Sequence, residues 1–349
     1  MRNTRVVLTG LGGPEVFRVV EDDVRDPGAN ELRIRILACG VAFADVLMRR
    51  GLYSGVPPLP YSPGYDIVGI VESSGPVESR GPVESRGPGA ARFHPGDSVA
   101  ALTQTGGYSR YIVLPESELV RVPEGLDPAE AVSLVLNYTT AYQLIYRIAQ
   151  MRQGENVLIH GGAGGVGTAA LQLGAMHGLK MLATASKRKH DLVASLGGIP
   201  IDYRAEDFVE RALSEQPGGV DAVFDPIGGR NWLRSYRALG PHGRFVGYGM
   251  SAAIEGGRRR PLLAGASFAW LALAGLIPGK SARWYSITTE KKKHPEWFRE
   301  DLSGLLAMLQ EKSIRPVVAE RLPLRGAGRA HEMLERASVS GKIVLMCQE

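Results

Sequence analysis

Three glycines, Gly162, Gly164 and Gly167, have the spacing GxGxxG and are the residues most indicative of chemistry. An apolar run, 157–160, precedes them, and a run of small and apolar residues, 168–177, follows. This order predicts a strand, a tight turn and a helix whose N-terminus and backbone N–H groups face a pyrophosphate. One glycine makes the turn, one lets the phosphate approach, and one lets the helix pack on the strand. The residues expected to contact a dinucleotide here are Gly162, Gly164, Gly165, Val166 and Gly167.

The end of the next expected strand, 180–185, indicates which dinucleotide binds. Domains that prefer NAD usually carry Asp or Glu there, to hold the ribose 2′-hydroxyl. This chain instead continues with Ser186, Lys187, Arg188 and Lys189. Because serine and lysine suit an additional phosphate dianion, we expect NADPH, with Ser186 and Lys187 as the phosphate ligands. The alternative is that these cations only solvate the start of a helix.

The elements around this turn alternate in type from residue 126 onward. We expect a helical segment at 128–148, then strands at 155–160, 180–185, 199–202, 221–225 and 243–248, and helices at 165–177, 189–196, 206–215 and 232–239. Alternating strands and helices predict a parallel sheet with helices on both faces. Ligands of such sheets bind beyond the carboxyl ends of the strands.

The flanking regions have a different pattern. The N-terminal part predicts short strands at 5–8, 31–38, 67–72, 98–102 and 109–113 and one helix at 43–50. The C-terminal part predicts helices at 296–311 and 326–336 and a strand at 342–346. A tandem Gly-Pro-Val-Glu-Ser-Arg repeat at Gly75–Arg86 predicts a polar loop, to which we assign no chemistry.

Composition excludes several classes of function. The 349 residues suffice for two domains, and the formal charge of +5 comes from scattered basic residues, so we expect no nucleic-acid partner. With only Cys39 and Cys347 there is no disulfide framework, and a reducing cytoplasm is expected. The N-terminus carries no apolar signal region.

One segment, 262–277, is nearly all apolar but shorter than a membrane span. We therefore expect no integral membrane segment, and interpret 262–277 as a buried or interface helix. The alternative is an apolar patch over a substrate pocket or at a dimer contact.

Several blocks of sequence carry a family resemblance. They are 38–45, 50–53, 59–64, 106–109, 137–142, 163–167, 183–186, 201–203, 224–229 and 341–345. On these blocks the chain resembles the zinc-independent quinone oxidoreductases of the medium-chain dehydrogenase/reductase superfamily, closest to the vesicle amine transport protein branch. The resemblance implies an α/β fold with two domains and a substrate cleft between them. A GroES-like β-rich catalytic domain would comprise 1–128 and 289–349, and a Rossmann doubly wound parallel-sheet domain, 129–288, would bind NADPH. It also implies a homodimer.

The same resemblance predicts that no metal is bound. Zinc alcohol dehydrogenases of this superfamily place a cysteine ligand where this chain has Ala42, and a histidine ligand where the block Gly64-Tyr65-Asp66 stands. A catalytic zinc needs about three such ligands. The four-cysteine structural lobe is also missing, and the seven histidines are dispersed.

Without a metal, a quinone or an α,β-unsaturated carbonyl is the easiest hydride acceptor, because charge spreads to an oxygen that one or two hydrogen bonds can stabilise. The resemblance implies Tyr53 as the donor to that oxygen; the alternative is an apolar wall residue. We expect Phe43, Leu47 and Tyr65 to line the substrate pocket. Some relatives carry a tyrosine at the position of Leu47 and an asparagine at that of Ala42, so this pocket is expected to be more apolar.

The remaining expected cofactor contacts also follow from the resemblance. Asn137 and Thr140 match positions near the nicotinamide, although Thr140 could instead cap a helix. Tyr203 matches a position at the adenosine end or is a core-edge residue. Gly249 and Met250 would line the nicotinamide pocket through backbone groups, and Asp66 would pair with a nearby cation.

These observations favour an NADPH-dependent reductase of a quinone or an enone, including an enoyl reductase. Two alternatives remain at this point: an NADPH-binding scaffold with weak or no catalysis, and a non-redox enzyme such as a cyclase on the same fold.

Overall fold

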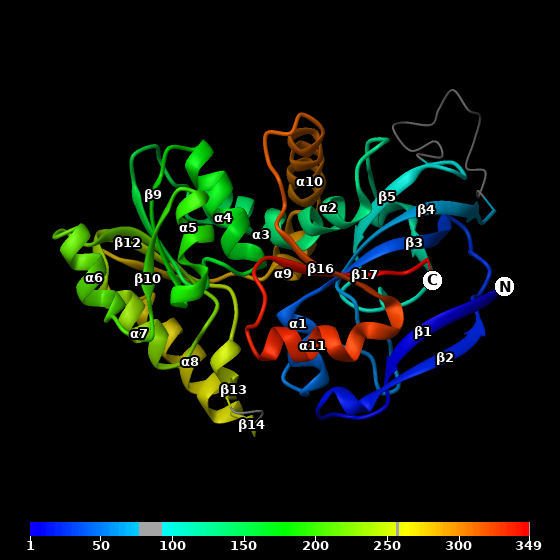
Figure 1. Cartoon of the computed structure of the whole chain (residues 1–349), viewed down its shortest axis with the longest axis horizontal. Helices are drawn as coiled ribbons and strands as arrows, with labels where there is room; N and C mark the ends of the chain where they lie inside the picture. Colours follow the sequence, from blue (N-terminus) through cyan, green and yellow to red (C-terminus); the bar gives the residue numbers. More distant parts are fainter. Residues whose placement is uncertain (77–92, 256–257, 349) are drawn as a thin grey trace. The chain divides into compact units, whose positions relative to one another are not determined.

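The computed structural model describes residues 1–76, 93–255 and 258–348 (Figure 1). The repeat at Gly75–Arg86 falls largely outside these ranges. The chain forms two compact units. Unit 1 comprises Met1–Leu136, Leu302–Ser338 and Lys342–Glu349, and unit 2 comprises Asn137–Asp301 and Val339–Gly341. Domain boundaries near 128 and 288 stay a prediction.

Unit 2 contains a six-stranded parallel sheet in the order β10-β9-β8-β11-β12-β15. The strands are β8 (Asn156–Ile159), β9 (Lys180–Ala185), β10 (Gly198–Asp202), β11 (Val220–Asp225), β12 (Leu239–Gly247) and β15 (Ser281–Trp284). The chain leaves β8 toward β9 and later returns to its other side as β11. The carboxyl end of β8 is therefore the switch point where ligands of such sheets bind.

Helices cover both faces of this sheet, with α4 (Gly165–Met176) and α5 (His190–Ser195) on one face and α6 (Phe208–Glu215) and α7 (Arg230–Arg237) on the other (Figure 1). The other helices of unit 2 are α3 (Thr139–Tyr142), α8 (Pro261–Ala274) and α9 (Ile287–Lys293), and α10 (Pro295–Gln310) continues into unit 1. Two short strands, β13 (Ile254–Glu255) and β14 (Arg258–Arg259), pair antiparallel. This arrangement confirms the expected doubly wound sheet.

Unit 1 is β-rich, as expected for a GroES-like domain. Its seven-stranded sheet has the order β16-β17-β3-β4-β5-β7, with β6 paired to β3. The strands are β3 (Glu31–Val41), β4 (Asp66–Ser74), β5 (Ser98–Leu102), β6 (Tyr111–Pro115), β7 (Val120–Arg121), β16 (Val318–Pro323) and β17 (Lys342–Met346). A separate pair comprises β1 (Arg2–Leu8) and β2 (Phe17–Asp23), and the helices are α1 (Phe43–Arg49), α2 (Pro128–Ser133) and α11 (Ala327–Glu335).

Several elements differ from the sequence-based expectation. The helical segment 128–148 contains π-helical turns at Leu134–Tyr138 and Gln143–Ile148. The strands β2, β15 and β16 and the helix α9 were not predicted, because short or half-exposed strands have weak alternation. The segment 262–277 is helical up to Ala274, but much of it is exposed. The interpretation as a buried helix was therefore wrong, and that as an interface helix stays a prediction. Among the described residues no helix is long and apolar enough to cross a membrane.

Candidate functional site

The glycine turn lies at the carboxyl end of β8 and leads into α4. Gly161 has φ +69°, a left-handed conformation that favours glycine. A Cβ on Gly162 would lie 2.7 Å from the Cβ of Ala183, and a Cβ on Gly167 would collide with the Gly161 carbonyl oxygen. The amides of Gly165 and the next two residues start a helix, so they have no intrahelical acceptor. The turn therefore has the close approach and the unpaired donors that a pyrophosphate requires.

A buried chain of hydrogen bonds holds this turn through the backbone N–H of Gly161. The Ser235 hydroxyl donates its one hydrogen to Asp225 Oδ2, 2.7 Å away. It must therefore accept the hydrogen bond from His160 Nε2, which lies 2.9 Å away. His160 Nδ1 is then the acceptor for Thr184 Oγ1 at 3.1 Å. Thr184 Oγ1 in turn accepts the backbone N–H of Gly161 at 3.2 Å. Sequence reasoning missed this chain because its members lie on β9, on β11, on α7 and in the turn after β8, far apart in the sequence.

Burial lowers the pKa of His160; the Asp225 carboxylate opposes this shift and the Arg234 guanidinium adds to it. The imidazole is therefore neutral, as the direction of its hydrogen bonds requires. All these side chains are almost completely buried, so the Ser235–His160–Asp225 arrangement holds the turn and is closed to a substrate.

Asn137 lies against the first residue of α4. A Cβ on Gly165 would collide with Asn137 Nδ2, so only glycine allows this approach. The Asn137 side chain is buried at the edge of the turn. Thr140 lies three residues further, inside a continuous helix, and its hydroxyl interacts with Tyr285. The alternative that Thr140 caps a helix is therefore wrong.

The end of β9 presents a serine and cations. Ser186 is buried and directly precedes a short 3-10 turn, Lys187–Lys189, whose side chains at 187 and 188 are exposed. Lys189 instead donates to the Val339 carbonyl oxygen. Tyr203, which follows the neighbouring strand β10, is 50% exposed, and its place at the adenosine end stays a prediction.

Gly249 and Met250 follow β12. A Cβ on Gly249 would lie 2.8 Å from the Pro226 carbonyl oxygen, and the Met250 side chain is buried against Gly228. Met250 therefore packs through its side chain, and the expected backbone contacts of Gly249 and Met250 with the nicotinamide stay a prediction. The cofactor residues expected from the sequence thus lie at the carboxyl ends of β8, β9, β10 and β12 and on the helical segment before β8.

In unit 1, the hydroxyl groups of Tyr53 and Tyr65 lie 2.6 Å apart, within hydrogen-bonding distance. Their rings contact edge to face, with centroids 6.1 Å apart. Tyr65 is buried and Tyr53 is partly exposed. Phe43 and Leu47 are one helical turn apart on α1 and are both partly exposed.

Asp45 fixes the start of α1. Its carboxylate accepts the backbone N–H of Ala42 at 2.8 Å and that of Gly64 at 3.0 Å, which ties α1 to the loop before Tyr65. Burial raises the pKa of Asp45 to about 7, although these two amides favour the ionised form. Nearby, Asp66 pairs with Lys342 Nζ at 2.8 Å, which confirms the expected cation partner.

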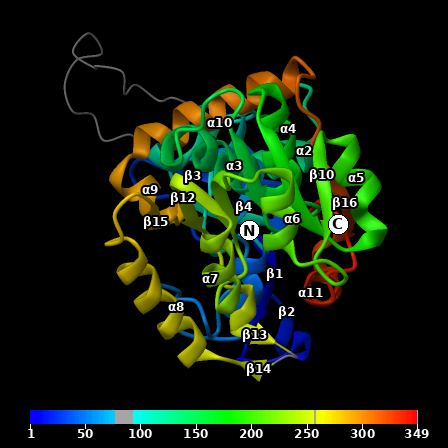
Figure 2. The ribbon, with the colours of Figure 1, turned by 90° about the vertical axis from the view of Figure 1, so that its left-hand side faces the viewer.

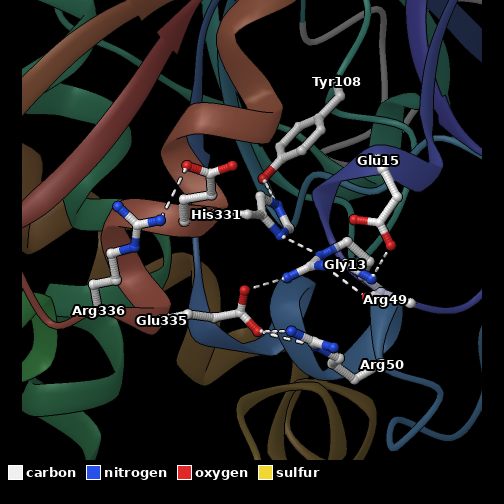
Figure 3. Close-up of polar contacts among 10 residues, drawn as sticks. Gly13, Glu15, Arg49, Arg50, Tyr108, His331, Glu335 and Arg336 are labelled. Atoms are coloured by element: carbon white, nitrogen blue, oxygen red, sulfur yellow. Dashed lines mark hydrogen bonds and ion pairs between the residues drawn. The ribbon is translucent and has the colours of Figure 1, made fainter. Parts of the chain in front are cut away.

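A second buried histidine, His331, organises α1 and α11 (Figure 3). Arg49 Nε donates to His331 Nδ1 at 3.3 Å, and His331 Nε2 lies 3.0 Å from Tyr108 Oη. Arg49 is buried and pairs with Glu335 at 2.6 Å. Burial, together with Arg49, holds the pKa of His331 well below its usual range.

No group of three or more His, Cys, Asp or Glu side chains that could hold a metal occurs within residues 1–76, 93–255 and 258–348. The two cysteines, both buried, are free.

Comparison with known proteins agrees with this geometry. Residues 28–124 match the alcohol dehydrogenase GroES-like domain family, and residues 198–345 match a family described as zinc-binding dehydrogenase. The human synaptic vesicle membrane protein VAT-1 homolog is 31% identical over 98% of this chain and 86% of its own length. The rat quinone oxidoreductase is 30% identical over 96% of this chain and 95% of its own length.

Solved structures give the same result. The Escherichia coli quinone oxidoreductase complexed with NADPH superposes with a TM-score of 0.83 and 28% identity, covering 98% of this chain and 99% of that one. A mycobacterial protein complexed with NADPH has a TM-score of 0.82 and 28% identity over 99% of each chain. This chain therefore belongs to the quinone oxidoreductase and VAT-1 family of the medium-chain dehydrogenase/reductase superfamily.

Proposed function

We propose that this chain is an NADPH-dependent oxidoreductase that reduces a quinone or an α,β-unsaturated carbonyl compound without zinc. The observation that carries the proposal is the glycine turn: unpaired amides at the start of α4, followed one strand later by Ser186 and exposed cations. The family membership and the NADPH complexes of two structural relatives support it.

The residues present fit this cofactor. The first-turn amides of α4 suit the pyrophosphate, and Ser186 with Lys187 suits the 2′-phosphate. Asn137, whose amide is buried beside Gly165, could hold the carboxamide or the ribose. The half-exposed ring of Tyr203 leaves a face on which the adenosine can pack. NADPH supplies the hydride that the substrate accepts.

In unit 1, Tyr53 and Tyr65 are proposed to stabilise the charge that reaches the substrate oxygen. A phenol that accepts a hydrogen bond from a second phenol becomes a stronger donor of its own proton. Tyr65 is buried and held by its neighbours, so Tyr53 is the member of the pair that presents its hydroxyl to the substrate. Phe43 and Leu47 on α1 provide an apolar surface that suits a conjugated ring or an enone.

The proposal that the reaction needs no zinc rests on the side chains at the two expected zinc-ligand positions. The position of the expected cysteine ligand is Ala42, the N-terminal neighbour of α1, and Tyr65 stands in the block where a histidine is expected. Neither side chain is a usual zinc ligand. Elemental analysis of the purified protein is expected to show no stoichiometric zinc, and one zinc per chain would contradict the proposal.

The reductase activity is tested with purified protein, NADPH and a panel of quinones and enones. We expect nicotinamide absorbance to fall with at least one acceptor. Tyr53→Phe is expected to lower kcat about tenfold to a hundredfold, with the dissociation constant of NADPH unchanged. Tyr111→Phe is the matched control, and its activity should equal that of the wild type. Tight NADPH binding without consumption would instead favour the scaffold.

Cofactor preference is tested separately. Lys187→Ala is expected to weaken NADPH binding about tenfold and to leave NADH binding unchanged, because only NADPH carries the 2′-phosphate. Equal loss for both cofactors, or better turnover with NADH, would contradict the assignment.

We also propose that the protein is a homodimer in the cytoplasm. Strand β15 pairs only with β12 among the described strands, so its other edge can accept a strand from a second copy. Light scattering is expected to give the mass of a dimer, and a monomer at micromolar concentration would contradict this proposal.

A further inference from the structure

His190 is the one polar side chain on the buried face of α5. It is 9% exposed, and its Nε2 atom is buried without a hydrogen-bond partner within residues 1–76, 93–255 and 258–348. A buried nitrogen without a partner lowers stability, whereas an apolar side chain of similar size would not. The imidazole therefore indicates a partner that the described part of the chain does not supply.

The chain places this ring at the ligand edge of the parallel sheet. Strand β9 ends at Ala185, the turn Lys187–Lys189 follows, and α5 begins at His190. The start of α5 therefore lies at the carboxyl ends of the strands, where the glycine turn also lies. Side chains on a helix lean toward its N-terminus, so the ring of His190 leans toward this edge. Figure 2 shows α5 beside β10, the strand that leads to Tyr203.

The face of α5 that carries His190 also contacts the glycine turn. Val193 is the other buried residue of this helix, and a Cβ on Gly162 would lie 3.6 Å from Val193 Cγ2. Residues three apart share one face of a helix, so His190 and Val193 lie on the same side of α5. His190 is thus one helical turn closer to the ligand edge than the residue that packs against Gly162.

The charges near the start of α5 are positive. Burial lowers the pKa of Lys189, and the guanidinium groups of Arg188 and Arg204 lower it further. Like charges have this effect only at short range, so both guanidinium groups lie near the Lys189 ammonium. The one acid from residue 185 to residue 196 is Asp191, whose side chain is exposed. This positive region suits a doubly charged phosphate.

We propose that His190 is a specificity-determining residue that donates Nε2–H to the 2′-phosphate of NADPH. This inference rests on the proposed function, and it adds to Ser186 and Lys187 a ligand on the buried side of the site. A phosphate oxygen pairs the buried nitrogen through a charge-assisted hydrogen bond. NADH offers only a neutral hydroxyl at this position, so its hydrogen bond is weaker and NADPH is favoured.

The test compares two ligands that differ only in the 2′-phosphate, adenosine 2′,5′-bisphosphate and adenosine 5′-monophosphate. Titration calorimetry with the full chain should show that the bisphosphate binds the wild type more tightly. His190→Leu should weaken binding of the bisphosphate about tenfold and leave binding of the monophosphate unchanged. His190→Gln, whose side-chain amide can still donate, should retain most of the affinity for the bisphosphate.

Two further measurements separate a phosphate ligand from a residue that only packs. The urea midpoint of His190→Leu should equal or exceed that of the wild type, because the variant removes the unpaired nitrogen. NMR of the imidazole nitrogens should show that the Nε2 signal of His190 shifts when the bisphosphate is added and stays in place when the monophosphate is added.

The matched control is His177→Leu, which changes a partly buried histidine at the end of α4, on the opposite edge of the sheet. It should bind both ligands like the wild type. The inference is overturned if His190→Leu binds the bisphosphate as tightly as the wild type while Lys187→Ala binds it more weakly. An equal loss for both ligands in His190→Leu would show a structural role and would overturn it too. If the wild type binds neither NADPH nor the bisphosphate, the proposed function itself fails.

Discussion

Two buried histidines, one in each unit, have the same hydrogen-bonding pattern but different starting donors. In unit 2, the chain of donors starts at the backbone N–H of Gly161 and passes through His160 to the carboxylate of Asp225. In unit 1, it starts at the guanidinium of Arg49 and passes through His331 to the hydroxyl of Tyr108.

The difference in the starting donor separates two tasks. A backbone amide costs little to bury once it is bonded, so the His160 chain serves mainly to hold the glycine turn in one conformation. A buried guanidinium is costly unless each of its donors is paired, so the Arg49 chain serves mainly to hold α1 and α11 together. We expect changes in unit 2 to affect NADPH binding and changes in unit 1 to affect stability.

The largest effect is expected from Arg49→Ala, which leaves the buried Nδ1 of His331 without its donor and Glu335 with Arg50 alone. We expect the free energy of unfolding of unit 1 to fall by about 3–5 kcal/mol. Urea unfolding followed by far-ultraviolet circular dichroism measures it. At a low temperature, where the variant stays folded, its NADPH affinity should equal that of the wild type. A large loss of affinity in the folded variant would contradict the division of tasks between the two units.

Gly167→Ala should have the opposite profile. Its Cβ would collide with the Gly161 carbonyl oxygen and lie 2.7 Å from the Gly162 Cα, so the turn must shift. We expect NADPH to bind on the order of 100-fold more weakly, as titration calorimetry measures. The control is Gly304→Ala, where a Cβ meets nothing within 4 Å on α10. Unchanged affinity in Gly167→Ala would contradict the assigned turn.

Ser235→Ala tests the link between His160 and Asp225. It leaves the buried Nε2–H of His160 without an acceptor, at a cost of about 1–3 kcal/mol. All four tryptophans, Trp232, Trp270, Trp284 and Trp297, lie in unit 2, so tryptophan fluorescence during urea unfolding reports this unit. The weakened support should also lower NADPH affinity. A variant as stable as the wild type would show that the chain of hydrogen bonds is unimportant.

The smallest effect is a difference in acid sensitivity. Both histidines have lowered pKa values, so below their ordinary value of 6.5 only the unfolded chain binds the proton, and stability falls as the pH falls. Each histidine lowers the free energy of unfolding by at most about 1.4 kcal/mol for each pH unit below 6.5. In unit 1, Asp45 opposes this loss, because its raised pKa of about 7 makes the folded state bind a proton first.

We therefore expect tryptophan fluorescence during urea unfolding to show that unit 2 loses stability between pH 6.5 and pH 5. The far-ultraviolet circular dichroism transition, which includes unit 1, should shift less over the same range. His160→Gln should remove most of the slope in unit 2. An equal slope in this variant and the wild type would assign the acid sensitivity to other groups.

The parts of the fold that could be predicted from the sequence are those that depend on residues close together in the chain. The strands β9, β5 and β17 were predicted with their observed bounds, because their β-rich runs end at glycine, proline or polar residues. The sequence left open whether α8 is buried or presents an apolar patch. A helix that is apolar on all sides is usually buried, and only the packing of α7 on one side shows which leucines remain in water.

The amino-acid order alone determined the α/β alternation, the glycine turn and the basic end of β9, because each depends on residues within about one helical turn or strand. Only the tertiary structure decided the partners of the buried charges. Arg49 meets His331 across 282 positions, and Lys342 meets Asp66 across 276. No local pattern marks such pairs, since burial in the folded chain is what makes an isolated charge costly and a distant partner necessary.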